Sequence, residues 1–181
     1  MGKHILVTGL PGVGKTTLIR KVLAGLPPAF PVAGFFTGEL REGGHRVGFE
    51  IETLDGRKGV LSHVRFQSPC RVGRYGVDIG GFERLVLPIL RAGEPDLYVI
   101  DEIGKMECFS GPFVQAMTAL LDAGTPVFGS VALKGGGFIE RVKGRSDVTL
   151  VEVTVRTRDS LVGQIVPELR KQLGGLLPKG T

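Results

Sequence analysis

The sequence predicts an α/β fold: a mostly parallel central sheet with helices on both faces and an appended antiparallel β-meander. Short apolar runs alternate with helical patterns along the chain, which is typical of a parallel sheet with crossover helices. A glycine-rich loop joins the first apolar run to the first helical pattern. Tight-turn signals at Gly43-Gly44 and Asp55-Gly56 flank a stretch of alternating apolar and polar residues, which indicates the meander.

The first half of the chain supplies two strands, one helix and the meander. Residues 5–7 form an apolar strand, and residues 16–26 place apolar side chains at helical spacing up to a glycine and a proline. A second strand follows at 32–37. The turn signals predict the β-meander over about 38–64, and the aperiodic, arginine-rich segment 65–79 is interpreted as a loop.

The second half alternates helices and strands to the end of the chain. The apolar spacing predicts helices over 81–92, 111–123, 138–143 and 159–173, and strands over 97–100, 126–133 and 149–155. The tail over about 176–181 is expected to fray. Because no repeat or linker divides the chain, we predict a single domain over residues 1–181.

Composition excludes several classes of protein. A chain of 181 residues, 42% hydrophobic, can bury a core without disulfides, and Cys70 and Cys108 are expected to be reduced thiols. Its apolar runs are far shorter than the roughly 20 residues of a membrane helix, and the N-terminal run is too short for a secretory leader. We therefore expect a cytoplasmic protein with no membrane partner. A net charge of +5 without a nucleic-acid-binding motif makes nucleic acid an unfavoured partner.

Residues 9–16 read GLPGVGKT, which matches the phosphate-loop pattern G-x-x-x-x-G-K-[ST] between a strand and a helix. The glycines let backbone N–H groups turn toward phosphate oxygens, and the helix N-terminus adds the positive end of its dipole. Lys15 is predicted to contact the β- and γ-phosphates, and the Thr16 hydroxyl to bind Mg²⁺. The predicted nucleotide-contacting residues of this segment are Gly9, Leu10, Pro11, Gly12, Val13, Gly14, Lys15, Thr16 and Thr17.

An acidic pair, Asp101-Glu102, follows the apolar strand at 97–100. Ligands of α/β sheets bind at the carboxyl ends of the strands, so Asp101 is placed to hold Mg²⁺ and Glu102 to act as the base on an attacking water. The alternative is a solvated acidic pair that ends a strand. Residues 101–104 also match the D-x-x-G switch of GTPases, but the chain contains no asparagine for the N-K-x-D that reads guanine.

Three segments together resemble the THEP1 family of nucleoside-triphosphatases, which includes the vertebrate cancer-related nucleoside-triphosphatase. They are residues 9–16, RVGRYGVD at 71–78 and, most specifically, DEIGKME at 101–107. The resemblance implies a RecA-like P-loop fold and Mg²⁺-dependent hydrolysis of nucleoside triphosphates with loose base preference. The family shows T-x-x-N-R-D near its C-terminus, associated with the base. This chain has TVRTRD at 154–159, with Thr157 in place of the asparagine.

Arginines and a loop after the acidic pair are further candidates. Arg71 and Arg74 are predicted to stabilise the charge that develops in phosphoryl transfer, and Arg158 to lie against the base or ribose. Each is equally compatible with a solvated surface charge. Lys105 and Glu107 lie in a loop that could close over the γ-phosphate, where a salt bridge is as plausible as chemistry.

We therefore expect an enzyme that hydrolyses ATP, GTP, CTP or UTP to the diphosphate and phosphate with Mg²⁺ as cofactor. Its catalytic residues would be Lys15, Glu102 and one of Arg71 and Arg74, and Thr16 and Asp101 would bind the metal. A kinase for a nucleotide or small molecule with the same donor site is the alternative, but no lid is evident to exclude water. An NTP-driven nucleic-acid-binding module is a third interpretation. A compact chain of this length is expected to work as a monomer.

Overall fold

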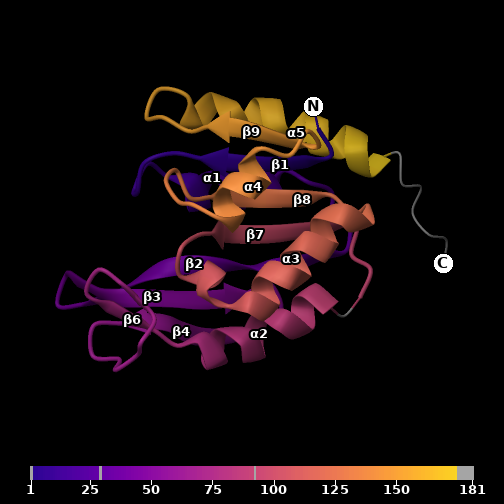
Figure 1. The fold of residues 1–181 in the computed structure, drawn as a ribbon. Coiled ribbons are helices and arrows are strands. Elements are labelled where there is room, and N and C mark those ends of the chain that lie inside the picture. The colour runs from indigo at the N-terminus through magenta and orange to yellow at the C-terminus, as the bar shows by residue number, and fades with distance from the viewer. Residues whose placement is uncertain (1, 29, 92, 175–181) are drawn as a thin grey trace.

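The computed structural model describes residues 2–28, 30–91 and 93–174, which form one nine-stranded sheet flanked by helices (Figure 1). The strand order in the sheet is β5-β6-β4-β3-β2-β7-β8-β1-β9. The strands are β1 (His4–Thr8), β2 (Val32–Glu42), β3 (His45–Thr53), β4 (Lys58–His63), β5 (Arg71–Val72), β6 (Tyr75–Val77), β7 (Leu97–Ile103), β8 (Val127–Val131) and β9 (Val148–Glu152). The helices are α1 (Lys15–Ala24), α2 (Ile79–Arg91), α3 (Gly111–Ala123), α4 (Phe138–Lys143) and α5 (Arg158–Gly174), with a short 3₁₀ turn, η1 (Glu107–Phe109). The predicted frayed tail at 176–181 lies outside the described residues.

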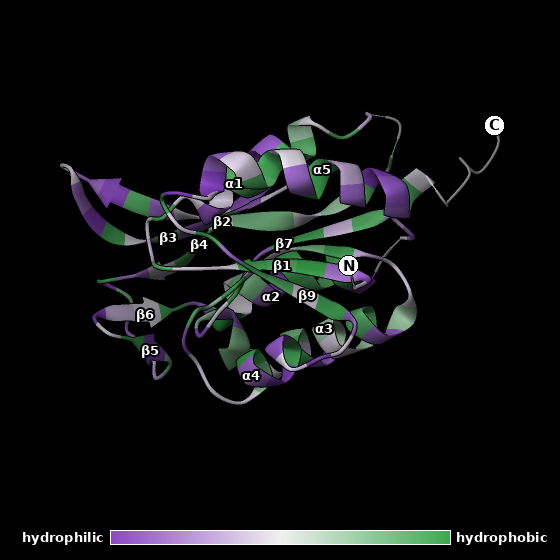
Figure 2. Ribbon diagram, turned by 90° about the horizontal axis from the view of Figure 1, so that it is seen from above, coloured by the Kyte–Doolittle hydropathy of each residue, from purple (hydrophilic) through white to green (hydrophobic). Residues whose placement is uncertain are grey.

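The α/β architecture is confirmed. Strands β2, β7, β8, β1 and β9 pair in parallel, so their carboxyl ends meet at one edge of the sheet. Helices α1 and α5 pack on one face, and α2, α3 and α4 pack on the other (Figure 2). This arrangement brings the loop after β1 and the acidic end of β7 to the same edge, with β8 between them.

An aromatic cluster joins the sheet to two of its helices. Phe35 of β2, Phe82 of α2 and Phe113 of α3 are fully buried. Their ring centroids lie 5.1 to 6.3 Å apart in edge-to-face arrangements, the geometry that aromatic pairs prefer. The opposite face of the sheet has its own core, in which buried side chains of α1 and α5 meet those of β1. Both faces of the central strands are therefore buried under helices.

The prediction of a mostly parallel sheet is wrong, because half of the pairings between neighbouring strands are antiparallel. Strand β2 continues past the predicted end to Glu42 and turns into β3 through Gly43 and Gly44, whose φ angles of 55° and 81° favour glycine. The segment 65–79, interpreted as a loop, contains a second hairpin, β5–β6. Each tight turn reverses the chain, so the strands it adds must be antiparallel.

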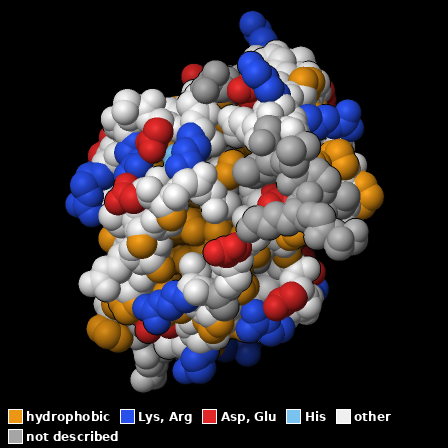
Figure 3. Space-filling model, turned by 90° about the vertical axis from the view of Figure 1, so that its right-hand side faces the viewer, with side chains coloured by type: hydrophobic (Ala, Val, Ile, Leu, Met, Phe, Trp, Pro, Cys, Tyr) orange, Lys and Arg blue, Asp and Glu red, His pale blue; other side chains and the backbone are white. Residues whose placement is uncertain are grey.

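Two features bear on the expected partners: the length of the apolar helices and the charge at one end of the sheet. No helix in the described part of the chain is long and apolar enough to cross a bilayer. Figure 3 shows the end of the molecule opposite the phosphate loop. There, outside the grey atoms, Lys and Arg side chains alternate with Asp and Glu, and apolar side chains are visible between them.

Candidate active site

The loop between β1 and α1 has the curled backbone of a phosphate-binding loop. Gly12 and Gly14 have φ angles of 76° and 104°, a region that side chains rarely adopt, so these two positions favour glycine. Lys15 begins α1 and folds back over the loop, donating a hydrogen bond from Nζ to the Gly9 carbonyl oxygen at 3.2 Å. Leu10 is 65% exposed at the tip. The loop is therefore preformed and open to solvent on its outer side.

The acidic pair lies across β8 from this loop. Asp101 is 1% exposed, its Oδ1 accepts a hydrogen bond from the Ser130 hydroxyl on β8, and its Oδ2 has no partner among the described residues. Glu102 is partly exposed and its Oε2 lies 3.7 Å from Lys15 Nζ. The structure thus brings together Lys15, Thr16, Asp101 and Glu102, as their predicted roles require.

Burial raises the pKa of both carboxyl groups of the acidic pair. It raises the pKa of Asp101, and the Ser130 and Thr16 hydroxyls and the charge of Lys15 oppose that rise. Burial also raises the pKa of Glu102; Lys15 opposes this rise, and the neighbouring Asp101 adds to it. A carboxylate whose pKa is raised is a stronger base toward water at neutral pH. The environment of Glu102 therefore suits a proton acceptor.

The residues at this edge fit a magnesium ion. Asp101 Oδ2 is a buried carboxylate oxygen without a partner in the described structure, and the Thr16 hydroxyl is among the groups that act on this carboxylate. Mg²⁺ prefers such oxygen ligands and is usually bound by one or two carboxylates together with water and substrate phosphates. The described residues contain no cluster of three His, Cys, Asp or Glu suited to a metal. The Thr16 hydroxyl and Asp101 Oδ2 are thus two protein oxygens at this edge that fit the ion.

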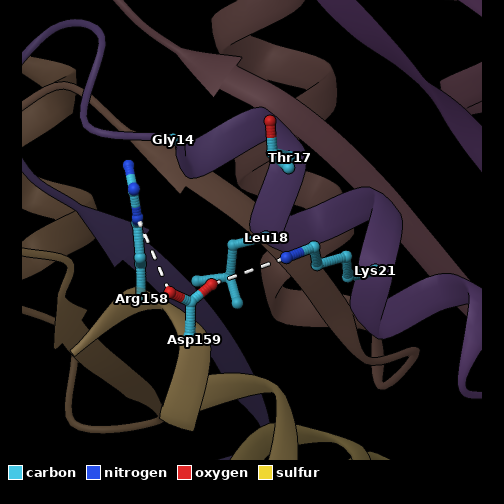
Figure 4. A pocket seen from close by; sticks show the side chains of 6 residues that line it. All are labelled: Gly14, Thr17, Leu18, Lys21, Arg158 and Asp159. Atoms are coloured by element: carbon cyan, nitrogen blue, oxygen red, sulfur yellow. Dashed lines mark hydrogen bonds and ion pairs between the residues drawn. The ribbon is translucent and has the colours of Figure 1, made fainter. Parts of the chain in front are cut away.

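A cavity of about 230 Å³ opens beside the start of α1. In Figure 4, the side chains of Lys21 and Arg158 converge on Asp159, at 3.5 Å and 3.9 Å. Arg158 also donates to the Val13 carbonyl oxygen at 3.4 Å, so the arginine predicted to contact the base or ribose is adjacent to the phosphate loop. The lining consists of Gly14, Thr17, Leu18, Lys21, Arg158 and Asp159.

Thr157, which stands where the family has asparagine, points into its own turn. Its Oγ1 accepts a hydrogen bond from the Thr154 N–H at 3.0 Å and also bonds the Thr154 hydroxyl. The Thr157 carbonyl oxygen accepts from Ser160. The side chain therefore stabilises the turn that leads into α5.

The structure does not bring Arg71 or Arg74 to the phosphate loop. They belong to the β5–β6 hairpin at the far edge of the sheet, seven strand positions from β1, or about 30 Å along the sheet. The Arg71 guanidinium donates to the carbonyl oxygens of Phe66 and Arg74, and Arg74 donates to that of Arg46. These bonds hold the hairpin together. Whether either arginine stabilises the transition state is left to experiment.

Three residues that contact this site were not singled out from the sequence as functional. Ser130 is the one polar residue in the buried strand β8, and that interruption of an apolar run is a signal that could have identified it. Lys21 lines the cavity but looks like an ordinary polar residue of an amphipathic helix, and Asp159 ends the TVRTRD segment without having been given a role of its own. Only the packing of α1 against α5 brings them together.

Comparisons with known proteins agree with this geometry. A family model described as NTPase matches residues 4–166. The chain is 43% identical over 182 residues to the cancer-related nucleoside-triphosphatase of Homo sapiens, covering 92% of this chain and 96% of that protein. It is 40% identical over 172 residues to the nucleoside-triphosphatase THEP1 of Thermotoga maritima, covering 94% and 97%. The crystal structure of THEP1 from Aquifex aeolicus matches with a TM-score of 0.84 at 34% identity, covering 92% and 98%. The resemblance seen in the sequence is thus confirmed, and the chain belongs to the NTPase family that includes the THEP1 nucleoside-triphosphatases.

Proposed function

We propose that the protein is a Mg²⁺-dependent enzyme that hydrolyses nucleoside triphosphates to the diphosphate and phosphate. One observation carries the proposal: the phosphate-loop lysine and the acidic pair face each other across a single strand, with Lys15 Nζ 3.7 Å from Glu102 Oε2. The names of the relatives support it, since each is called a nucleoside-triphosphatase. The kinase alternative has no support from any of them.

The proposal gives each group a role. The N–H groups of the loop and the N-terminus of α1 would bind the phosphates, and Lys15 would neutralise charge on the β- and γ-phosphates. Thr16 and Asp101 would hold Mg²⁺, which when bound neutralises charge on the phosphate oxygens. Lys15 now lies beside Glu102. A nucleotide would draw it toward the phosphates and leave Glu102 free to act.

Glu102 would then orient a water molecule and accept its proton as the water oxygen bonds to the γ-phosphorus. The bond from that phosphorus to the β–γ bridging oxygen breaks, and the diphosphate leaves with the electron pair. General-base assistance of this kind contributes about 100- to 10,000-fold to a rate. The loss expected on replacing Glu102 by glutamine lies in that range.

The proposal also covers the fold class, the cellular compartment and the oligomeric state. We assign the fold to the RecA-like P-loop class, which is supported by β8 lying between the strand of the loop and the strand of the acidic pair. We also propose that residues 1–181 act as one cytoplasmic domain, as a monomer and without nucleic acid. The two cysteines are both free, in line with a reducing compartment.

The test is phosphate release from ATP, GTP, CTP and UTP by the pure protein with Mg²⁺ and no acceptor. Lys15→Ala and Glu102→Gln are each expected to lower kcat at least 100-fold, and Glu102→Gln should keep nucleotide affinity. Lys58→Ala is the matched control, because Lys58 lies exposed on β4 and, within the described part of the chain, pairs with the partly exposed Glu52. Chelation of Mg²⁺ should stop release. No release from any of the four nucleotides by the wild-type protein would reject the proposal.

The same assay tests the two hairpin arginines. Because Arg71 and Arg74 lie far from the loop, a role in the transition state requires the hairpin to move or a second copy to supply them. The turnover of Arg71→Ala and of Arg74→Ala tests whether either side chain takes part in the reaction. Wild-type turnover in both variants would remove these residues from the catalytic set.

A further inference from the structure

Glu107 is a buried carboxyl group that the proposed reaction does not use. It begins the short turn η1, which follows the acidic end of β7, and it is only 5% exposed. The turn is held by its backbone, since the Cys108 N–H donates to the Gly104 carbonyl oxygen at 3.0 Å and the Ser110 N–H to that of Glu107 at 3.1 Å. Glutamate is almost never buried without a reason.

The carboxyl groups of Glu107 and Glu102 lie close together beside Gly104. A Cβ atom placed on Gly104 would lie 2.7 Å from Glu107 Oε2 and 2.9 Å from Glu102 Oε1. Since both oxygens approach the same point, they can be no more than 5.6 Å apart, the sum of those distances. Glycine at this position leaves the space in which the two carboxyl groups approach each other. The backbone N–H groups of Gly104 and Glu107 also bond the Glu107 carboxyl group, so it is held in place.

Two carboxyl groups this close in a buried site do not both ionise readily. Burial raises the pKa of Glu107 to about 8, and the charges of Glu102 and Asp101 add to the rise. The other titratable group of its own turn is Cys108, whose pKa burial raises to about 12, and Arg141 of α4 faces that thiol. At neutral pH Glu107 therefore carries a proton, and a protonated carboxyl group is a hydrogen-bond donor.

We propose that Glu107 is a positioning residue for the base: its carboxyl O–H donates a hydrogen bond to Glu102 Oε1, which leaves Oε2 aimed at the phosphate loop and the attacking water. The inference rests on the proposed function, because it concerns the base of that reaction. Glu107 keeps its proton throughout, and the proton of the water goes to Glu102. Glu107 would thus hold Glu102 in place as a carboxylate while Lys15 is engaged with phosphate.

Two substitutions separate positioning from packing. Glu107→Gln keeps the shape and an N–H donor, so kcat should stay within about threefold of wild type. Glu107→Leu fills the site without a donor, and kcat should fall about 10- to 100-fold with KM unchanged. Leucine also leaves the Gly104 and Glu107 N–H groups without their carboxyl acceptor, so the Tm of this variant should fall, and kcat is compared at a temperature at which circular dichroism shows both variants folded. Equal losses of kcat in the two variants, or wild-type kcat in the leucine variant, would overturn the proposal.

The pH dependence of kcat adds a readout that packing alone would not change. Wild-type kcat should fall on the alkaline side, because Glu107 ionises and becomes a repelling neighbour of Glu102. Glu107→Gln cannot ionise and should lose this alkaline limb. An alkaline limb that persists unchanged in the glutamine variant would contradict the assignment.

A second experiment needs no activity. Carboxyl carbons of the metal-free, nucleotide-free protein, labelled with ¹³C at glutamate, are followed by NMR as the pH is raised. The Glu107 signal should titrate near pH 8 in wild type and at a clearly lower pH in Glu102→Gln, which removes the neighbouring charge. A Glu107 that titrates near 4.5 in wild type, or is unaffected by Glu102→Gln, would reject the pairing even if leucine impairs folding. If instead the wild type releases no phosphate while the titrations behave as stated, the proposed function fails and the pairing stands.

Discussion

The hydroxyl of Ser130 is expected to support Asp101, the proposed metal-binding acid, and Ser130→Ala tests this. Ser130 is fully buried and donates the one hydrogen bond that Asp101 Oδ1 accepts in the described structure, while Oδ2 has no partner there. The substitution removes a single oxygen and leaves almost no cavity, so its effect isolates the hydrogen bond. Oδ1 would then be a buried carboxylate oxygen without its donor, which costs about 1–3 kcal/mol.

A loss of about 2 kcal/mol lowers the Tm of a chain of this size by about 4–8 °C. Partners behind a metal ligand typically contribute about 10- to 100-fold to metal affinity. Ser130→Ala should therefore need at least 10-fold more Mg²⁺ for half-maximal phosphate release and recover much of its turnover at high Mg²⁺. Thermal unfolding followed by circular dichroism gives the first quantity, and a Mg²⁺ titration of phosphate release gives the second.

Ser62 of β4 provides the matched control. It is also fully buried on a strand, but its hydroxyl has no hydrogen-bond partner among the described residues. Ser62→Ala should leave the Tm unchanged or raise it slightly, because it removes an unsatisfied polar group. If both serine variants melt together, or if Ser130→Ala keeps the wild-type Mg²⁺ dependence, the hydrogen bond does not support the acid as argued.

Three further predictions concern pH and packing. Burial lowers the pKa of His4 below 6.5, so the stability that the neutral ring contributes is complete above pH 6.5 and is lost as the pH falls through the lowered pKa. An NMR titration of the His4 ring should therefore have a midpoint below 6.5, and a higher midpoint contradicts the prediction. Gly129→Ala would place a methyl group against the Ile100 carbonyl oxygen of β7 and should lower the free energy of unfolding in urea by more than about 3 kcal/mol. Gly136→Ala, with open space around it, should change that free energy by less than about 0.5 kcal/mol. Arg20 stacks over the Phe36 ring at 4.0 Å and pairs with Glu52 at 2.8 Å, so Arg20→Ala should lower the free energy of unfolding by about 1 kcal/mol. This loss should be smaller at high salt, which screens the ion pair in the wild type; a loss that does not change with salt would show that the ion pair contributes nothing.

Local patterns predicted the phosphate loop and most of the helices. The phosphate loop is a contiguous motif whose meaning depends only on the strand before it and the helix after it, and both are present. Helices α3 and α4 match their predicted bounds because their first and last turns carry clear signals, such as Ser110 accepting a hydrogen bond from the Phe113 N–H at the start of α3.

Short strands escaped the prediction because two or three residues carry no readable period. The β5–β6 hairpin over residues 71–77 lies in a segment that looked like an arginine-rich loop. Its position at the far edge of the sheet separates Arg71 and Arg74 from the phosphate loop, although their charge and setting suggested a catalytic role. Neither the pairing partner of an edge strand nor its distance from a site is written in local sequence.

By itself the sequence determined which residues are the candidates for the chemistry: a lysine and a threonine after a glycine-rich loop, and two acids after an apolar strand. Their spacing along the chain is enough, because each motif acts through its own backbone. Only the tertiary structure decided that β8 lies between them, that Ser130 bonds Asp101 from 29 residues away, and that Glu107 lies close to Glu102. These contacts depend on strand order and on the path of a tight turn, which follow from burial of the whole sheet rather than from any one segment.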